Sequence, residues 1–254
     1  MTLKDKIKNK TLTLGSWLSL GHSSIAEIFA KAELDWLVID LEHSVINISE
    51  AADLIRVIDL CGVAPLVRLT SNDPDQIKRM MDAGAHGIIV PMVKTVNEAI
   101  NAVAATRYEP KGNRGVGLAR AQGYGANFQE YLNWQNESVT IIVQIEHVDA
   151  LKNVNDILDV DGVDGLIIGP YDLSASMGIP GQFGNKEFTE ALDYIKKCAQ
   201  QKNSIIGTHI VEPEHSRLKQ AISEGYNFIA FSVDIRILDN AIRKTVSKYR
   251  EFIS

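Results

Sequence analysis

Short apolar runs alternate with longer segments of helical period along the whole chain. Eight of these runs have the length and composition of β-strands, and they span residues 12–18, 36–40, 64–68, 87–90, 140–145, 165–168, 204–208 and 228–231. Helices are expected in the segments between them. Eight strand–helix units favour a (β/α)8 TIM barrel of the α/β class, formed as a single domain over residues 1–254. A doubly wound sheet is the alternative.

Two of the expected helices have recognisable ends. Ser49 precedes a segment in which apolar residues recur at helical spacing, so Ser49 is the expected N-cap. Asp73 followed by Pro74 is typical of a helix start, and Gly84 is typical of a helix end. The apolar stripe of the first helix consists of Ala51, Leu54, Ile55 and Ile58.

Composition and charge narrow the class of protein. The chain is 45% hydrophobic and 23% charged, and its net charge of −6 is spread without long runs of one sign. These values predict no binding of nucleic acid or of an anionic membrane. The lysine-rich start is not followed by a secretory apolar stretch, and no apolar run is long enough to span a membrane. Cys61 and Cys198 have no metal-ligand spacing and are expected in buried helix positions, which favours a reducing cytoplasm.

Polar residues gather just past the expected strands. Glu146 and Asp172 each follow such a run, and 172 − 146 = 26 residues is about one strand–helix unit. The two carboxylates should therefore project into one pocket, as a site for a hard divalent cation would require. His43 and Arg68 follow or end the second and third strands in the same way.

Each of these residues also has a structural explanation. Asp172 is a possible N-cap, Glu146 a first-turn acid, and Arg68 a partner for Asp40. His43 alone is more often structural than catalytic. The histidines show no HxH or HExxH spacing, which disfavours a zinc site, although the one that follows Glu146 stays open.

The longest irregular stretch, residues 109–125, is rich in glycine and arginine. Its glycines do not form a phosphate-loop motif, which disfavours a nucleotide site. A loop over the pocket or a contact between subunits is expected instead.

Five segments in order carry a family resemblance: 35–43 (DWLVIDLEH), 67–68 with 72–74 (VR, NDP), 81–85 running into 90–93 (MDAGA, VPMV), 144–146 (QIE), and 169–174 with 177–178 (GPYDLS, MG). Together they resemble the HpcH/HpaI-type class II pyruvate aldolases, which act on 4-hydroxy-2-oxoheptanedioate or 2-keto-3-deoxy sugar acids. The resemblance implies a TIM barrel of the phosphoenolpyruvate/pyruvate-domain type. It also implies reversible cleavage of a 4-hydroxy-2-oxo acid to pyruvate and an aldehyde, through a metal-bound pyruvate enolate.

The resemblance further implies a role for each site residue. Glu146 and Asp172 would bind Mg2+, Mn2+ or Co2+, and Gln144, Tyr171 and Asp172 would contact the substrate. Arg68 would stabilise charge on the keto oxygen. His43 would be the acid/base that handles the proton of the C4 hydroxyl, and Asp40 and Asp82 would raise the pKa of the His43 imidazole. In this family the second aspartate crosses a subunit boundary, so a homo-oligomer, a trimer or hexamer, is expected.

Leu41 departs from the resemblance, because many family members have glycine there, and its bulk is expected to alter the aldehyde side of the pocket.

Three alternative functions are open. An acyl-CoA lyase of the malyl-CoA or citramalyl-CoA type would need a basic groove, for which Lys111, Arg114 and Arg120 are candidates. A class I aldolase would need a Schiff-base lysine, for which Lys94 is the candidate. A non-catalytic binding protein on this scaffold is the third.

Overall fold

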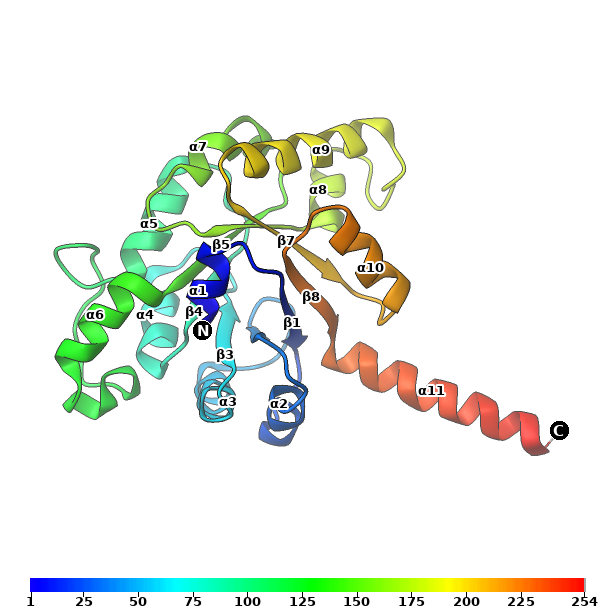
Figure 1. The fold of residues 1–254 in the computed structure, drawn as a ribbon, viewed down its shortest axis with the longest axis horizontal. Coiled ribbons are helices and arrows are strands. Elements are labelled where there is room, and N and C mark those ends of the chain that lie inside the picture. Colours follow the sequence, from blue (N-terminus) through cyan, green and yellow to red (C-terminus); the bar gives the residue numbers. More distant parts are fainter. Residues whose placement is uncertain (254) are drawn as a thin grey trace.

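The eight apolar runs form eight parallel strands that close into one barrel in sequence order (Figure 1). The computed structural model describes residues 1–253. The strands are β1 (Thr13–Leu18), β2 (Trp36–Asp40), β3 (Ala64–Arg68), β4 (Gly87–Val90), β5 (Thr140–Ile145), β6 (Gly165–Ile168), β7 (Ile205–Ile210) and β8 (Phe228–Val233). The closed barrel confirms the predicted (β/α)8 fold over the doubly wound sheet. β2 to β6 have the predicted ends, whereas β7 and β8 each run two residues further than predicted.

Helices follow the strands and form the outer layer (Figure 1). The helices are α1 (Leu3–Lys8), α2 (Ser23–Ala30), α3 (Ile48–Leu60), α4 (Pro74–Ala83), α5 (Val96–Thr106), α6 (Phe128–Ser138), α7 (Val154–Leu158), α8 (Pro170–Ser176), α9 (Lys186–Gln201), α10 (His215–Ser223) and α11 (Asp234–Ile253). Two 3₁₀ turns, η1 (Arg120–Gly125) and η2 (Val148–Lys152), lie in the connections. Among residues 1–253, no helix is long and apolar enough to cross a membrane.

The ends of α3 and α4 show how local side chains set the boundaries. The N-cap of α3 is Asn47, and the prediction of Ser49 was wrong. The Asn47 side chain accepts hydrogen bonds from the amides of Ser49 and Glu50, and the Glu50 carboxylate accepts one from the Asn47 amide in return. Asp73 caps α4, and Gly84 ends it with a φ of 99°, as predicted.

Apolar side chains pack in two layers, one inside the barrel and one between the strands and the helices. In the inner layer, Trp36 stacks on Phe228 with ring centroids 4.0 Å apart. Gly15 has to be a glycine there, because a Cβ atom on it would lie 2.1 Å from the Trp36 ring. The predicted stripe of α3 is fully buried in the outer layer.

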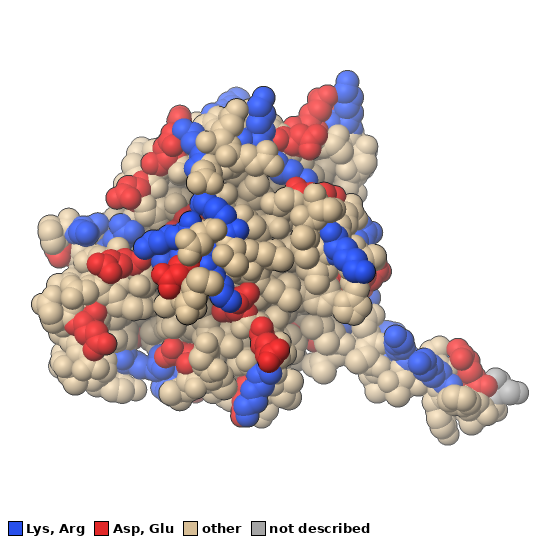
Figure 2. Space-filling view, viewed as in Figure 1, with Lys and Arg blue, Asp and Glu red and all other residues tan. Residues whose placement is uncertain are grey.

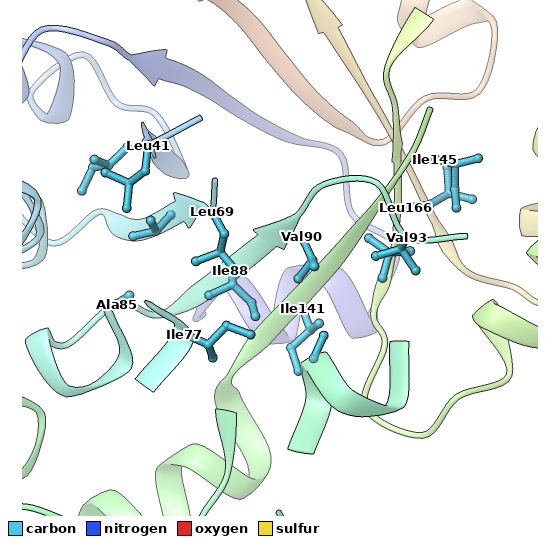
Figure 3. Packing of buried hydrophobic residues seen from close by; sticks show 14 of the residues in the cluster. Leu41, Leu69, Ile77, Ala85, Ile88, Val90, Val93, Ile141, Ile145 and Leu166 are labelled. Atoms are coloured by element: carbon cyan, nitrogen blue, oxygen red, sulfur yellow. The ribbon is translucent and has the colours of Figure 1, made fainter. Parts of the chain in front are cut away.

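Leu41 belongs to the outer layer. It is 5% exposed and clusters with Leu69 and Ile88 between the strands and the helices (Figure 3). It does not line the cavity at the barrel mouth. The expectation that its bulk alters the aldehyde pocket was therefore wrong, because the side chain points to the helix side of β2.

The two cysteines are free thiols in different environments. Cys198 is buried within α9, as predicted. Cys61 is only partly buried, because it is the C-cap of α3 and not a residue of its apolar stripe.

The last helix, α11, departs from the barrel and projects away from it (Figure 1). Six of its exposed apolar residues recur at spacings of three or four and therefore lie along one stripe: Ile235, Leu238, Ile242, Val246, Tyr249 and Phe252. Basic and acidic side chains are interspersed on the face of the molecule that Figure 2 shows. What distinguishes the surface of α11 is therefore its exposed apolar side chains and not a concentration of one sign of charge.

The short helix α1 covers the amino end of the barrel. Leu3 and Ile7 join the inner apolar layer. Between them, Lys4 inserts its ammonium group 2.6 Å from both carboxylate oxygens of Asp164 and 2.6 Å from the carbonyl oxygen of Val139. Asp164 also accepts a hydrogen bond from the amide of Ile141, so this ion pair ties α1 to β5 and to the start of β6.

Replacing Lys4 with methionine tests this ion pair, because methionine keeps most of the apolar stem and removes the charge. The variant should lose about 2–4 kcal/mol of unfolding free energy, since it leaves the largely buried Asp164 carboxylate without its cation. Urea denaturation monitored by circular dichroism measures the loss. Lys8→Met, at an exposed position of the same helix, is the control and should change stability by less than about 0.5 kcal/mol. Equal stabilities of the two variants would contradict the assignment.

Candidate active site

A cavity of about 620 Å³ opens at the carboxyl ends of the strands. In a (β/α)8 barrel this end is where reactive groups gather. Its lining includes five of the predicted site residues, namely His43, Arg68, Gln144, Tyr171 and Asp172. Residues that follow or end four different strands, from His43 after β2 to Asp172 after β6, therefore meet in one space.

Glu146 lies directly after β5 and is 2% exposed. Its Oε1 accepts a 2.7 Å hydrogen bond from the amide of Met92, and its Oε2 accepts one from the side-chain amide of Gln144. Gly169 leaves room for this carboxylate, since a Cβ atom there would lie 2.6 Å from Oε2. Burial raises the pKa of Glu146 to about 7, and the nearby charges of Glu42 and Asp172 add to the rise.

Met92 was not predicted as a site residue. It has a φ of 55°, a left-handed conformation that is uncommon for residues other than glycine. This turn after β4 directs the Met92 amide at Glu146. Strained backbone of this kind is concentrated at functional sites. For Met92 as a site residue, the sequence carried no signal beyond the position of this residue after a strand.

Asp172 lies in the first turn of α8 with its side chain exposed. It is not the N-cap of that helix, because Gly169 has that position. The capping explanation was therefore wrong. Its charge is close enough to raise the pKa of Glu146, so the two carboxylates belong to one site.

Arg68 is held on three sides. Its Nε and Nη2 donate hydrogen bonds of 2.9 and 2.7 Å to the two carboxylate oxygens of Asp40. Its Nε also lies 3.3 Å from Oε2 of Glu42, and its guanidinium carbon lies 4.3 Å from the ring centroid of Trp17. The pairing with Asp40 that the sequence left open is thus present. A guanidinium fixed in this way loses little entropy when it binds an anion.

His43 is well exposed, with 65% of its side chain accessible. The nearest carboxylate oxygen is Oε2 of Glu42, 3.9 Å from His43 Nε2. The carboxylate of Asp40 accepts hydrogen bonds from the backbone amides of Glu42 and His43 and does not contact the imidazole. Asp40 therefore shapes the turn that carries His43.

Asp82 does not line the cavity. It lies one residue before the end of α4, and α4 runs antiparallel to the strands for about 15 Å, so Asp82 is near the amino end of the barrel. It cannot reach His43 within one chain. Its Oδ1 is buried and has no hydrogen-bond partner in the described chain, and burial raises the pKa of the carboxyl.

Trp17 and His209 form a wall of the cavity that sequence reasoning missed. Their ring centroids are 5.2 Å apart, and Nε2 of His209 lies 3.1 Å from the carbonyl oxygen of Ser232. Burial lowers the pKa of His209 to about 4, so the ring is neutral at physiological pH. Both residues lie near the carboxyl ends of their strands, β1 and β7, and that position was the signal that could have found them.

The other candidates have structural roles. His147 caps η2 by accepting a hydrogen bond from the amide of Asp149. Arg114 is 3% exposed and donates to Tyr131 and Gln135, and Arg120 donates to Asp59. These arginines are occupied within the protein and do not form a basic groove.

The residues at the mouth fit a divalent cation. The donors are carboxylate oxygens, which suit hard ions, and Gly169 opens the space beside Glu146. Among residues 1–253, no group of three or more His, Cys, Asp or Glu side chains could hold a metal ion by itself. The protein would thus supply two carboxylates, and substrate or water would supply the remaining oxygens.

Comparisons with known proteins find relatives over almost the full length of the chain. The sequence profile of the HpcH/HpaI aldolase/citrate lyase family matches residues 13–241. A 4-hydroxy-2-oxo-heptane-1,7-dioate aldolase from Salmonella typhimurium is 38% identical over 247 residues, which cover 97% of this chain and 93% of that protein. Two crystal structures are similar over almost the full length. An HpcH/HpaI aldolase/citrate lyase family protein from Burkholderia cenocepacia has a TM-score of 0.91 at 32% identity, covering 98% of each chain. An HpcH/HpaI aldolase from Desulfitobacterium hafniense has a TM-score of 0.89 at 30% identity, covering 99% of this chain and 97% of its own.

The buried neutral His209 predicts a pH dependence of stability. Its pKa of about 4 in the folded protein lies below the value near 6.5 in the unfolded chain, so acid protonates the unfolded chain first. Stability should fall as the pH drops from 6.5 towards 4, by about 2 kcal/mol between about pH 7.5 and pH 5. His209→Gln should remove most of this difference, as measured by urea denaturation at the two pH values. The exposed His215→Gln should leave it unchanged, and a His209 variant with the full acid loss would show that another group causes it.

Proposed function

The chain belongs to the HpcH/HpaI aldolase/citrate lyase family and is a carbon–carbon lyase, and on this premise we propose a pyruvate aldolase. It reversibly cleaves a 4-hydroxy-2-oxo acid of the 2-keto-3-deoxy type into pyruvate and an aldehyde. The observation that carries the proposal is the meeting of Glu146, Asp172 and Arg68 at one barrel mouth. We place this activity in a single domain, in the reducing cytoplasm, where Cys61 and Cys198 stay free thiols.

Glu146 and Asp172 would hold Mg2+, Mn2+ or Co2+. A divalent ion at these carboxylates supplies Lewis-acid chemistry, which withdraws electron density from a keto oxygen. Gln144 fixes the orientation of Glu146 through their hydrogen bond. The backbone amides of Tyr171 and Asp172, in the first turn of α8, would receive the carboxylate of the substrate.

Arg68 stabilises the charge that develops on the keto oxygen. Cleavage breaks the bond between C3 and C4 of the substrate, and its electron pair moves towards C2 and the keto oxygen. The guanidinium is already fixed by Asp40 and Trp17, so little reorganisation is needed as the charge grows. The loss of one such donor costs about 10²- to 10³-fold in rate.

His43 moves the proton. As the bond between C3 and C4 breaks, the C4 hydroxyl becomes an aldehyde and gives its proton to the imidazole, directly or through one water. C3 then takes up one proton, which balances the proton that the C4 hydroxyl released, and pyruvate is formed. The exposed imidazole ring has room for a substrate and for a further group from outside the chain.

That further group is Asp82 of a second copy. Asp82 is half-buried at the far end of its own barrel, and its Oδ1 has no hydrogen-bond partner among residues 1–253. The apolar stripe on the projecting helix α11 provides a surface through which copies can associate. A homo-oligomer, a trimer or hexamer, would bring the Asp82 carboxylate to the imidazole of a neighbour and raise the pKa of that imidazole.

The alternatives lack comparable support. An acyl-CoA lyase would need the basic loop, but Arg114 and Arg120 are bound within the protein. Among the described residues, no lysine lines the cavity, and Lys94 follows β4 in a loop, which leaves a Schiff-base aldolase without its amine. A scaffold without catalysis would not require Glu146, Asp172 and Arg68 to converge.

A panel of aldehydes incubated with pyruvate and Mn2+ or Mg2+, with the products read by mass, tests the function directly. We expect 4-hydroxy-2-oxo acids to form, EDTA to abolish their formation and added Mn2+ to restore it. Glu146→Ala should abolish product formation, whereas Asp149→Asn, at an exposed carboxylate three residues away, should keep it. Product formation after complete metal removal, or trapping of pyruvate by borohydride, would contradict the metal-dependent reaction.

Mixed oligomers test the role of Asp82. Co-expression of His43→Ala and Asp82→Asn subunits should restore activity, because about a quarter of the sites pair an intact His43 with an intact Asp82 from a neighbour. Each variant alone should be weakly active. His43→Ala mixed with Arg68→Ala is the matched control and should restore nothing, because both residues line the same cavity. A mixture with Asp82→Asn that also restores nothing would place Asp82 outside the site.

A further inference from the structure

Glu42 has an unusual environment at the barrel mouth. It follows β2 by two residues, and only 17% of its side chain is exposed. Its Oε2 is buried and accepts no hydrogen bond in the described chain. Buried carboxylate oxygens in native proteins nearly always have a donor, because an unsatisfied one costs about 1–3 kcal/mol or more.

The two neighbouring basic side chains do not supply that donor. Nε of Arg68 lies 3.3 Å from Oε2 of Glu42, but Nε donates its hydrogen to Asp40. Nε2 of His43 lies 3.9 Å away, beyond hydrogen-bond length. The oxygen therefore has opposite charge nearby but no proton directed at it.

Glu42 also interacts electrostatically with the two carboxylates that would bind the metal. The charge of Asp172 acts on Glu42, and the charge of Glu42 acts on Glu146. These three carboxylates do not form a set that could hold an ion together. Glu42 thus stands beside the ion-binding pair without belonging to it.

We propose that Glu42 is a positioning residue whose Oε2 accepts a hydrogen bond from a water molecule on the divalent ion held by Glu146 and Asp172. This inference rests on the proposed function. Divalent ions such as Mg2+ keep several waters in protein sites, and each of those waters carries hydrogens that need acceptors. An acceptor placed outside the ligands strengthens ion binding and fixes the orientation of the water.

A competing explanation is that Glu42 only balances the charge of Arg68. The two explanations differ in what they require. Charge balance requires a negative charge near Arg68, and aspartate supplies it as well as glutamate does. A hydrogen bond to a particular water requires the length of the glutamate side chain, so Glu42→Asp separates charge from reach.

The affinity for Mn2+ can be measured without any substrate. The metal-free full-length protein is titrated with Mn2+, and free Mn2+ is read by electron paramagnetic resonance. Glu42→Gln should weaken Mn2+ binding by about 10- to 100-fold, and Glu42→Asp by about 10-fold. Asp149→Asn removes the same charge from an exposed position near Glu146 and should change the affinity by less than about twofold. Glu146→Gln should abolish binding.

The outcomes distinguish a failure of the proposed role of Glu42 from a failure of the proposed metal site. Wild-type affinity in Glu42→Asp, or equal affinities of Glu42→Gln and Asp149→Asn, would overturn the role of Glu42 while leaving the metal site intact. Unchanged Mn2+ affinity in Glu146→Gln would remove the proposed metal site and the inference with it. If Glu42→Gln does not fold, Glu42→Asp alone decides, because it keeps the charge beside Arg68.

Discussion

The barrel mouth gathers more negative charge than its own cations balance, and the rest of the site depends on this imbalance. Asp40, Glu42, Glu146 and Asp172 lie at the mouth, and Arg68 is the guanidinium that pairs with two of them, Asp40 and Glu42. Asp40 and Arg68 neutralise each other through two hydrogen bonds. The remaining carboxylates lie in a partly desolvated space and repel one another. Burial is the main cause of the raised pKa of Glu146, and the charges of Glu42 and Asp172 add to it. A divalent cation bound at Glu146 and Asp172 would relieve that repulsion, and Glu146 is already held in place by two hydrogen bonds.

The barrel supplies the rigidity that such an arrangement requires. Glu146 is held by the amide of Met92 from the β4 loop and by Gln144 from its own strand. Arg68 rests on Trp17 of β1 and pairs with Asp40 of β2. The Met92, Trp17 and Asp40 contacts each join different strands or strand ends of a closed sheet, so Glu146 and Arg68 are fixed from more than one strand. Catalysis by preorganised charge needs this kind of support.

Much of the fold and part of the site could be predicted from the sequence. Strand positions follow from apolar runs, and the place of Glu146 and Asp172 after two such runs predicts a shared pocket, because parallel strands end at the same face. The sequence offered the pairing of Arg68 with Asp40 as one alternative, but two other features could not be predicted. The Met92 amide on Glu146 depends on a left-handed turn, and the place of Leu41 depends on which side of β2 faces the helices.

The most direct test of the central claim follows the methyl protons of pyruvate in D2O by proton NMR, with the metal-loaded enzyme and no aldehyde. An enzyme that stabilises negative charge on the keto oxygen must also labilise these protons, whatever its natural aldehyde. We expect the methyl signal to fall only when enzyme and divalent ion are both present, and Glu146→Ala to abolish the exchange. A methyl signal that persists with the metal-loaded enzyme, or exchange that continues in EDTA, would contradict the account.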